Sequence, residues 1–241
     1  MNYQDLTVEY KLSMLLEGIR AVTTKLDNLK NRLEVPFDDG RRVGLSGMEL
    51  TLTGLGLTVH AISGAGLRST RRTLGEVQES FTNYVEIEGK NQEQLMAYPE
   101  SFWRWSLLTI FHFRLDTLFQ NLLRALGTDP GKSGFGANSN KLLELLSLSD
   151  EKQARNILAV ATHLRNSLHN NGIHRGTNWG PFVLNGLSYE FQQDRDVRCA
   201  SIGHILNVLD AIADVLADIF FSPEVRALPS VEDRYVDLIP S

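Results

Sequence analysis

The sequence predicts a mostly α-helical protein of the all-α class: a helical bundle with an N-terminal helical extension and one small β-hairpin. Apolar residues recur at three- and four-residue spacing over several long segments, which is the period of an α-helix. The clearest strand signal is confined to two short runs on either side of Asn185-Gly186. Hydrophobic residues make up 42% of the 241 residues, enough to bury a sizeable core.

Charge and cysteine content exclude several classes of protein. The formal net charge is -5, so the chain lacks the broad positive field of a protein that grips duplex DNA, and any contact with nucleic acid must be local. Cys199 is the single cysteine, which excludes an internal disulfide and a cysteine-based zinc site. The polar N-terminus has no signal-peptide core, and we expect a cytoplasmic protein.

Residues 5–34 are expected to form the first amphipathic helix. Its apolar positions alternate three and four residues apart, like a short heptad seam. The seam consists of Leu12, Leu15, Ile19, Val22, Leu26, Leu29 and Leu33. We expect it to pack on the chain's own bundle, and a dimerisation seam is the alternative. Pro36 and Asp38-Asp39-Gly40 supply the turn that ends the segment.

Residues 45–66 carry two periodicities at once. Leu50, Leu52, Leu55 and Leu57 nearly alternate, as in a β-hairpin. The wider set of apolar residues also keeps helical spacing, and we prefer a helix because the surrounding segments are helical. Glu49 and several Gly and Thr argue against a membrane span, so we expect no membrane association.

Residues 67–86 are expected to continue as a helix that carries the densest basic cluster of the chain, Arg68, Arg71 and Arg72. The cluster is either a solvated face or a contact for a phosphate backbone. A polar stretch over residues 86–98 predicts a loop. We therefore divide the chain into an N-terminal extension (1–97), a helical bundle (98–222) and a loosely ordered tail (223–241).

Residues 101–126 are predicted to form the central helix. The segment is apolar nearly all round, which is typical of a buried helix. Its apolar residues are Phe102, Trp103, Trp105, Leu107, Leu108, Ile110, Phe111, Phe113, Leu115, Leu118, Phe119, Leu122 and Leu123. Asp116 interrupts them, and an ionised group on a buried helix needs a partner. That partner is either a structural arginine or a group on the next long helix.

A short helix over residues 139–147 is expected to lead to a longer one that starts near Asp150. Ser149 or Asp150 can cap it, and Asn170-Asn171-Gly172 stops it, because Asn and Gly tolerate the left-handed conformation. Arg165 and His169 are four residues apart and therefore project from the same face. A cation and an imidazole thus lie on the last turns, where helix carbonyl groups favour positive charge.

A β-hairpin is expected to follow this helix. Phe182-Val183-Leu184 and the run 187–191 flank Asn185-Gly186, the strongest short turn signal. Residues 197–221 then have the helical pattern of the last core helix, which Pro223 ends.

The stretch Arg165-Asn166-Ser167-Leu168-His169-Asn170-Asn171-Gly172 resembles the signature of the HEPN superfamily. Members of that family are four- or five-helix bundles, and many are metal-independent ribonucleases of toxin–antitoxin, phage-defence and RNA-processing systems. Their motif is Arg, usually a polar residue, then four to six residues, then His. Arg165 and Asn166 match the first two positions, whereas three residues separate Arg165 from His169 and eight separate it from His174. The resemblance covers residues 98–222.

The resemblance implies an RNA-cleaving homodimer without cofactor or metal, whose two signature helices face each other across one cleft. Such cleavage needs a base for the ribose 2′-hydroxyl, a cation for the phosphorane charge and an acid for the leaving oxygen. The expected catalytic residues are Arg165, Asn166, His169 and His174, and Asp116 on the facing helix would orient Arg165 or His169. The expected RNA-binding residues are Arg68, Arg71, Arg72 and Arg175. An antitoxin or another regulatory protein is a further expected partner.

Two other functions remain open at this point. A non-catalytic HEPN-like module that binds a protein or a nucleotide would use Arg165 and His169 as structural residues of a helix end. The spacing from Arg165 to His169 and the acidic pI favour this alternative. A helical metal hydrolase would use His163, His169, His174 and His112, although the spacing of these histidines is poor for a shared metal.

Overall fold

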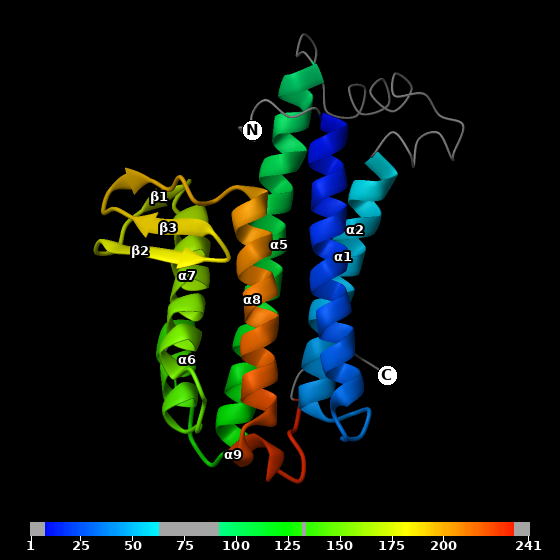
Figure 1. Cartoon of the computed structure of the whole chain (residues 1–241), viewed down its shortest axis with the longest axis vertical. Coiled ribbons are helices and arrows are strands. Elements are labelled where there is room, and N and C mark those ends of the chain that lie inside the picture. The colour runs from blue at the N-terminus through cyan, green and yellow to red at the C-terminus, as the bar shows by residue number, and fades with distance from the viewer. Residues whose placement is uncertain (1–7, 63–91, 132–133, 234–241) are drawn as a thin grey trace.

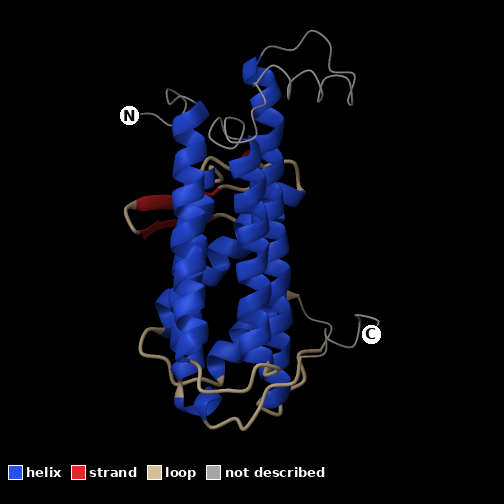
Figure 2. Ribbon diagram, turned by 90° about the vertical axis from the view of Figure 1, so that its right-hand side faces the viewer, coloured by secondary structure: helices blue, strands red, loops and turns tan. Residues whose placement is uncertain are grey.

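Long amphipathic helices stand side by side, and a small β structure covers one end of one of them (Figures 1 and 2). The structure, a computed structural model, describes residues 8–62, 92–131 and 134–233. The mostly helical class predicted from the sequence is confirmed. No helix in these ranges combines the length and the apolar character that crossing a membrane requires.

Helices α1 (Val8–Arg32) and α2 (Gly40–Ile62) pack against each other, and α1 also packs against α8. The expected heptad seam is used inside the chain, because its side chains from Leu15 to Leu33 are buried against these neighbours. It is therefore not free to form a dimer. Residues 45–62 are helical, as preferred over the hairpin. The buried side chains of α1 and α2 belong to the same hydrophobic core as those of α5, α7 and α8.

Helix α5 (Gln92–Ala125) is the central element, with contacts to α2, α6, α7 and α8. It begins before residue 101, so residues 92–98 are not the expected loop. The Gln, Glu, Leu and Met of that stretch are good helix formers despite its polar character. The expectation of burial all round is also wrong on one side, where Trp105, Ile110 and Phe113 are 43%, 47% and 53% exposed.

Helices α6 (Phe135–Glu144) and α7 (Glu151–His169) pack on each other and on α5. Helix α6 begins four residues before the expected 139 and ends before 147. Asp150 caps α7 as predicted, since its Oδ1 accepts the N–H of Gln153 at 3.0 Å. Helices α5 and α7 run in opposite directions, so the end of α7 lies beside the first half of α5 (Figure 1).

Strands β2 (Trp179–Leu184) and β3 (Leu187–Phe191) form the predicted antiparallel hairpin. Asn185 and Gly186 both have positive φ, 48° and 81°, as the tight turn requires. A second, unpredicted pair joins β1 (Ile173–His174) to β4 (Arg195–Asp196). This pairing delays the last helix, so α8 (Ile202–Phe221) begins five residues after the expected 197.

The chain after α8 packs against the bundle as far as residue 233. Helix α9 (Pro223–Arg226) follows at once, and Val225 and Val231 are fully buried. The guanidinium of Arg41 donates to the carbonyl oxygen of Val225 (3.0 Å), and Asp39 accepts the N–H of Val231 (3.0 Å). Residues 223–233 are thus packed, in contrast to the loose tail expected from residue 223 onward. Residues 234–241 lie outside the described ranges.

Candidate active site at the end of α7

The end of α7 is shaped by local sequence. Helix α7 ends at His169, and Asn171 (φ 56°) and Gly172 (φ 83°) take the left-handed conformation that the sequence predicted for this stop. The N–H of Gly172 donates to the carbonyl oxygen of Ser167 at 2.8 Å, which satisfies one of the free carbonyls of the last turn. The chain therefore turns back sharply after His169.

Arg165 and His169 lie together on the side of α7 that faces α5. The imidazole of His169 is exposed and meets Trp105 edge to face, with ring centroids 5.4 Å apart. Arg165 is half-buried, and its Nη1 donates to Oδ1 of Asn166 at 3.1 Å. The structure thus brings three of the four expected catalytic residues, Arg165, Asn166 and His169, to one helix end.

His112 on α5 is a neighbour of this pair. Burial, followed by the positive charges of Arg165 and His169, lowers the pKa of His112 from 6.5 to about 4, so it is neutral at pH 7. Its ring is 7% exposed and packs 4.2 Å from the ring of Phe135. Among the described residues, neither Nε2 of His112 nor the nearby Oγ1 of Thr109 has a hydrogen-bond partner, although both atoms are buried.

His174 does not join the site. Its ring is 2% exposed, its Nδ1 lies 3.4 Å from Oγ of Ser167, and its Nε2 lies 2.9 Å from the carbonyl oxygen of Thr177. Because a carbonyl only accepts, Nε2 carries the proton and donates to it. The rings of His163 (5.1 Å) and Phe191 (5.4 Å) pack against it. His174 therefore anchors β1 in the interior, in contrast to the catalytic position expected from the sequence.

Asp116 does not form the expected ion pair with Arg165 or His169. Its carboxylate accepts from Nε2 of Gln120 at 3.1 Å, and it has no salt bridge within the described residues. The reason is its place along α5. Asp116 follows Trp105 by eleven residues, about 16 Å of helix. Since α5 and α7 run in opposite directions, this displacement carries Asp116 away from the end of α7.

Of the expected RNA-binding arginines, Arg175 lies within the described residues. Arg175 is exposed and pairs with Asp194 at 2.8 Å, next to the strands. Arg68, Arg71 and Arg72 lie outside the described residues.

The four histidines considered as metal ligands lie in two separate groups. His163 and His174 lie in an aromatic cluster with Trp179 and Phe191, whereas His112 and His169 lie on the α5 side of α7. In the ranges that the structure describes, no three His, Cys, Asp or Glu side chains gather as metal ligands would. This arrangement does not support the metal-hydrolase alternative.

Sequence reasoning missed two residues of this site. Trp105 was assigned to the core, and His112 was considered only as a metal ligand. A signal was present, because Trp105, Thr109 and His112 are four and three residues apart and share one face of an otherwise apolar helix.

Comparisons with known proteins add no further assignment. No family model, no curated protein and no solved structure matches the chain. The functional interpretation rests on the residues and the geometry described above.

Proposed function

We propose that the protein is a metal-independent endoribonuclease of the HEPN type, active as a homodimer in a toxin–antitoxin or phage-defence setting. The observation that carries this proposal is the placement of Arg165 and His169 on one face of the last turns of α7, with the imidazole exposed on the ring of Trp105. A guanidinium can bind phosphate oxygens, and an imidazole can transfer protons near neutral pH, so the pair can serve metal-free RNA cleavage.

The proposed reaction is attack of a ribose 2′-hydroxyl on the neighbouring phosphorus. An imidazole removes the hydroxyl proton, the new P–O bond forms, and the bond to the 5′-oxygen breaks as that oxygen gains a proton. Arg165 binds the equatorial phosphate oxygens and stabilises the charge that develops on them. His169 of one protomer is the base, and its copy in the other protomer is the acid. The products are a 2′,3′-cyclic phosphate and a 5′-hydroxyl.

The environment of His169 supports this assignment. Trp105 limits the orientations of the imidazole, since the two rings are in edge contact. His112 is neutral at pH 7, so it adds no positive charge beside the proposed catalytic pair. The buried Nε2 of His112 has no hydrogen-bond partner in the described part of the chain, which is costly to stability. A histidine with a purely structural role would normally avoid that cost, as His174 does.

A binding module without catalysis is the second candidate. Ile110 and Phe113 are large, exposed apolar side chains on α5, the helix that also carries Trp105. Exposed apolar surface of this kind marks protein–protein contacts. In the enzyme, this surface would contact a second copy of the chain. In the binding module, it would contact a regulatory protein. Because the surface fits both candidates, the experiment must measure cleavage itself.

The experiment is a cleavage assay with a single-stranded RNA, without added metal and with a chelator present. We expect cleavage to persist with the chelator and to leave a 2′,3′-cyclic phosphate. Arg165→Ala should lose about 2–4 kcal/mol of transition-state stabilisation, roughly a thirtyfold to thousandfold loss of rate. His169→Ala should lose at least ~10²-fold.

Arg226→Ala is the matched control, because Arg226 is an exposed arginine on α9, the short helix that follows α8. It should leave the rate unchanged. Full activity of Arg165→Ala, or loss of wild-type activity on adding the chelator, would contradict the metal-free mechanism. Absence of cleavage by folded wild-type protein would favour the binding module.

A further inference from the structure

Two hollows adjoin along strands β3 and β4, whose residues contribute to the lining of both. Figure 1 shows β3 near the end of α7. Their volumes are about 590 Å³ and 290 Å³, and they meet at Glu190, Gln192 and Arg195. We call them together the strand groove. The larger hollow extends toward Arg198 and His204, and the smaller one toward Asn178 and Trp179. None of these residues belongs to the catalytic site proposed above.

The walls of the strand groove are held in place by contacts within the chain. Strand β4, which supplies Arg195, pairs with β1. The thiol of Cys199 donates to the carbonyl oxygen of Glu190 (3.6 Å), which ties the segment after β4 to β3. His204 packs on Tyr189 with ring centroids 5.3 Å apart. The groove is therefore preformed, as ligand-binding sites usually are.

Two arginines of the strand groove make no salt bridge within the described part of the chain. Arg175, close by, is paired with Asp194, whereas Arg195 and Arg198 are exposed and make no salt bridge with any described residue. Glu190 and Asp196 line the same hollow, so the arginines and carboxylates balance in number. A balanced groove cannot hold a polyanion by charge alone, and binding must depend on specific contacts.

The remaining groups are suited to nucleobases. Gln192 and Gln193 carry amides, which pair with the edges of bases, and the carboxylate of Glu190 can accept from a base amino group. Arginine forks bind phosphate oxygens. Base edges are free for such contacts in single-stranded RNA, whereas paired strands conceal them. We propose that the strand groove binds a single-stranded stretch of the RNA substrate, an inference that rests on the proposed function.

A protein partner fits this surface less well. The lining is dominated by charged and amide side chains, so an apolar side chain would find little to bury against. The exposed apolar residues Ile110 and Phe113 are on α5, a different element. The polar groove thus fits a nucleic-acid strand, and the apolar side of α5 fits a protein surface.

The test measures RNA binding separately from cleavage. A fluorescent 12-nucleotide single-stranded RNA is titrated with full-length His169→Ala protein, in which cleavage is slowed, and with the same protein carrying Arg195→Ala and Arg198→Ala. We expect Kd to rise at least tenfold. Loss of two phosphate contacts should also lower the slope of log Kd against log salt by about 1.4, since each contact on a single strand contributes about 0.7.

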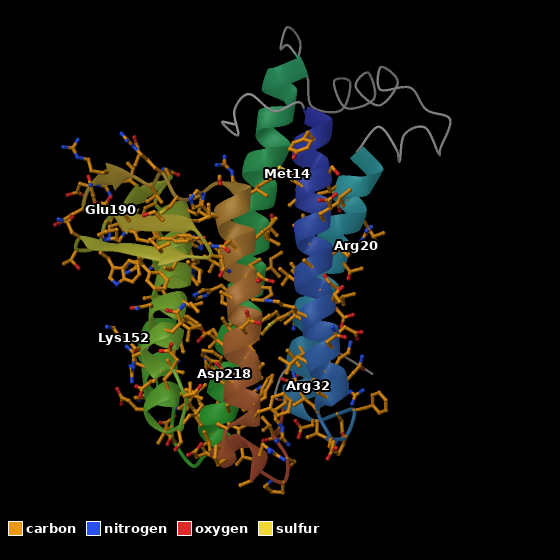
Figure 3. The ribbon with its side chains drawn as sticks, viewed as in Figure 1. Met14, Arg20, Arg32, Lys152, Glu190 and Asp218 are labelled. Carbon is orange, nitrogen blue, oxygen red and sulfur yellow. The ribbon has the colours of Figure 1, made fainter. Side chains whose placement is uncertain are left out.

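The matched control carries Lys152→Ala and Arg226→Ala, which also removes two exposed positive charges. Lys152 lies toward the other end of α7 from the hairpin, whose Glu190 is labelled in the same view (Figure 3). The Kd of this control variant should stay within about twofold of that of the His169→Ala protein. An equal loss in the control, or an unchanged Kd in the groove variant, would refute the inference. Competition by a free mononucleotide as strong as by the RNA strand would also refute it.

Kinetics separate this inference from the proposed function. In protein that keeps His169, Arg195→Ala with Arg198→Ala should raise KM at least tenfold and leave kcat unchanged. If the wild type cleaves RNA and the double arginine variant has the same KM and Kd as its parent protein, the proposed groove is refuted and the proposed ribonuclease activity stands. If the wild type does not cleave RNA but the double arginine variant shows the expected rise in Kd, the ribonuclease activity is refuted and the RNA-binding groove stands. Thermal unfolding of each variant confirms that it is folded.

Discussion

At the scale of single residues, burial decides which histidine can take part in chemistry. His169 is exposed beside Arg165, whereas His174 has both ring nitrogens close to oxygen atoms of its own chain and is shut off from solvent. His112 is intermediate, because it is buried beneath the site and its Nε2 has no hydrogen-bond partner among the residues that the structure describes. His169 is therefore exposed at the site, His174 has a structural position, and His112 supports the site from below.

The pH dependence of stability tests the position of His112. The pKa of His112 is about 4 in the folded protein, below its ordinary value of 6.5. As pH falls below 6.5, the unfolded chain binds a proton that the folded chain does not. Stability is therefore lost between pH 6.5 and 4, by about 1.4 kcal/mol per pH unit.

We expect the His112→Phe variant to lack this pH-dependent loss of stability. Between pH 7 and pH 5, its free energy of unfolding should fall by about 2 kcal/mol less than that of the wild type, since the interval includes about 1.5 units below the ordinary pKa. Urea unfolding at the two pH values measures the difference. His163, whose pKa burial also lowers, is present in both proteins and cancels. Equal losses in both proteins would show that His112 titrates normally when folded.

At the scale of elements, one polar side chain of α8 fastens the hairpin. Nδ2 of Asn207 donates to the carbonyl oxygen of Leu184 and to the hydroxyl of Tyr189, both at 2.9 Å. The Tyr189 hydroxyl donates in turn to the carbonyl oxygen of His204 at 2.8 Å. Asn207 thus joins both strands of the hairpin to the helix that they cover. Because a two-stranded hairpin is only marginally stable by itself, this attachment holds the strand groove in shape.

Asn207→Ala should release the hairpin from α8. We expect a loss of about 1–3 kcal/mol in the free energy of unfolding, because buried polar groups are left without partners. Amide hydrogen exchange should accelerate at Leu187 and Tyr189 and stay slow at Leu26 in α1. Asn156→Ala is the control, since the Asn156 side chain forms no hydrogen bond with the described residues. Unchanged exchange in the hairpin would show that apolar packing alone holds it.

At the scale of the whole molecule, a buried ion pair links the start of α2 to the segment that follows α8. Asp39 and Arg41, with side chains 0% and 4% exposed, lie at the start of α2. Burial opposes ionisation of Asp39, but hydrogen bonds from Arg41 and Val231 outweigh it and lower its pKa. The same pair binds Val225 and Val231 near the other end of the chain. Closure of the bundle therefore depends on a contact between residues far apart in sequence.

Asp39→Asn should open this connection. It leaves the Arg41 charge buried without a counterion, and we expect a loss of about 3–5 kcal/mol in the free energy of unfolding. Lys25→Met is the comparison, because Lys25 pairs with Asp210 and Asp214 while 39% exposed, and exposed pairs contribute at most about 1 kcal/mol. Denaturant unfolding at pH 7 compares the two. Similar losses would mean that the buried pair stabilises no more than a surface pair.

Sequence alone determined the features that local chemistry dictates. Helical periodicity predicted α1, α7 and most of α5, and Asn185-Gly186 predicted the hairpin turn, because these signals act over a few residues. The pairing of Arg165 with His169 on one face follows from helix geometry in the same way. Tertiary structure alone decided the burial of His174, the displacement of Asp116 and the approach of Trp105 and His112 to the site. Those outcomes depend on which residues of other elements pack nearby, and the pattern of a single segment contains no information about its neighbours.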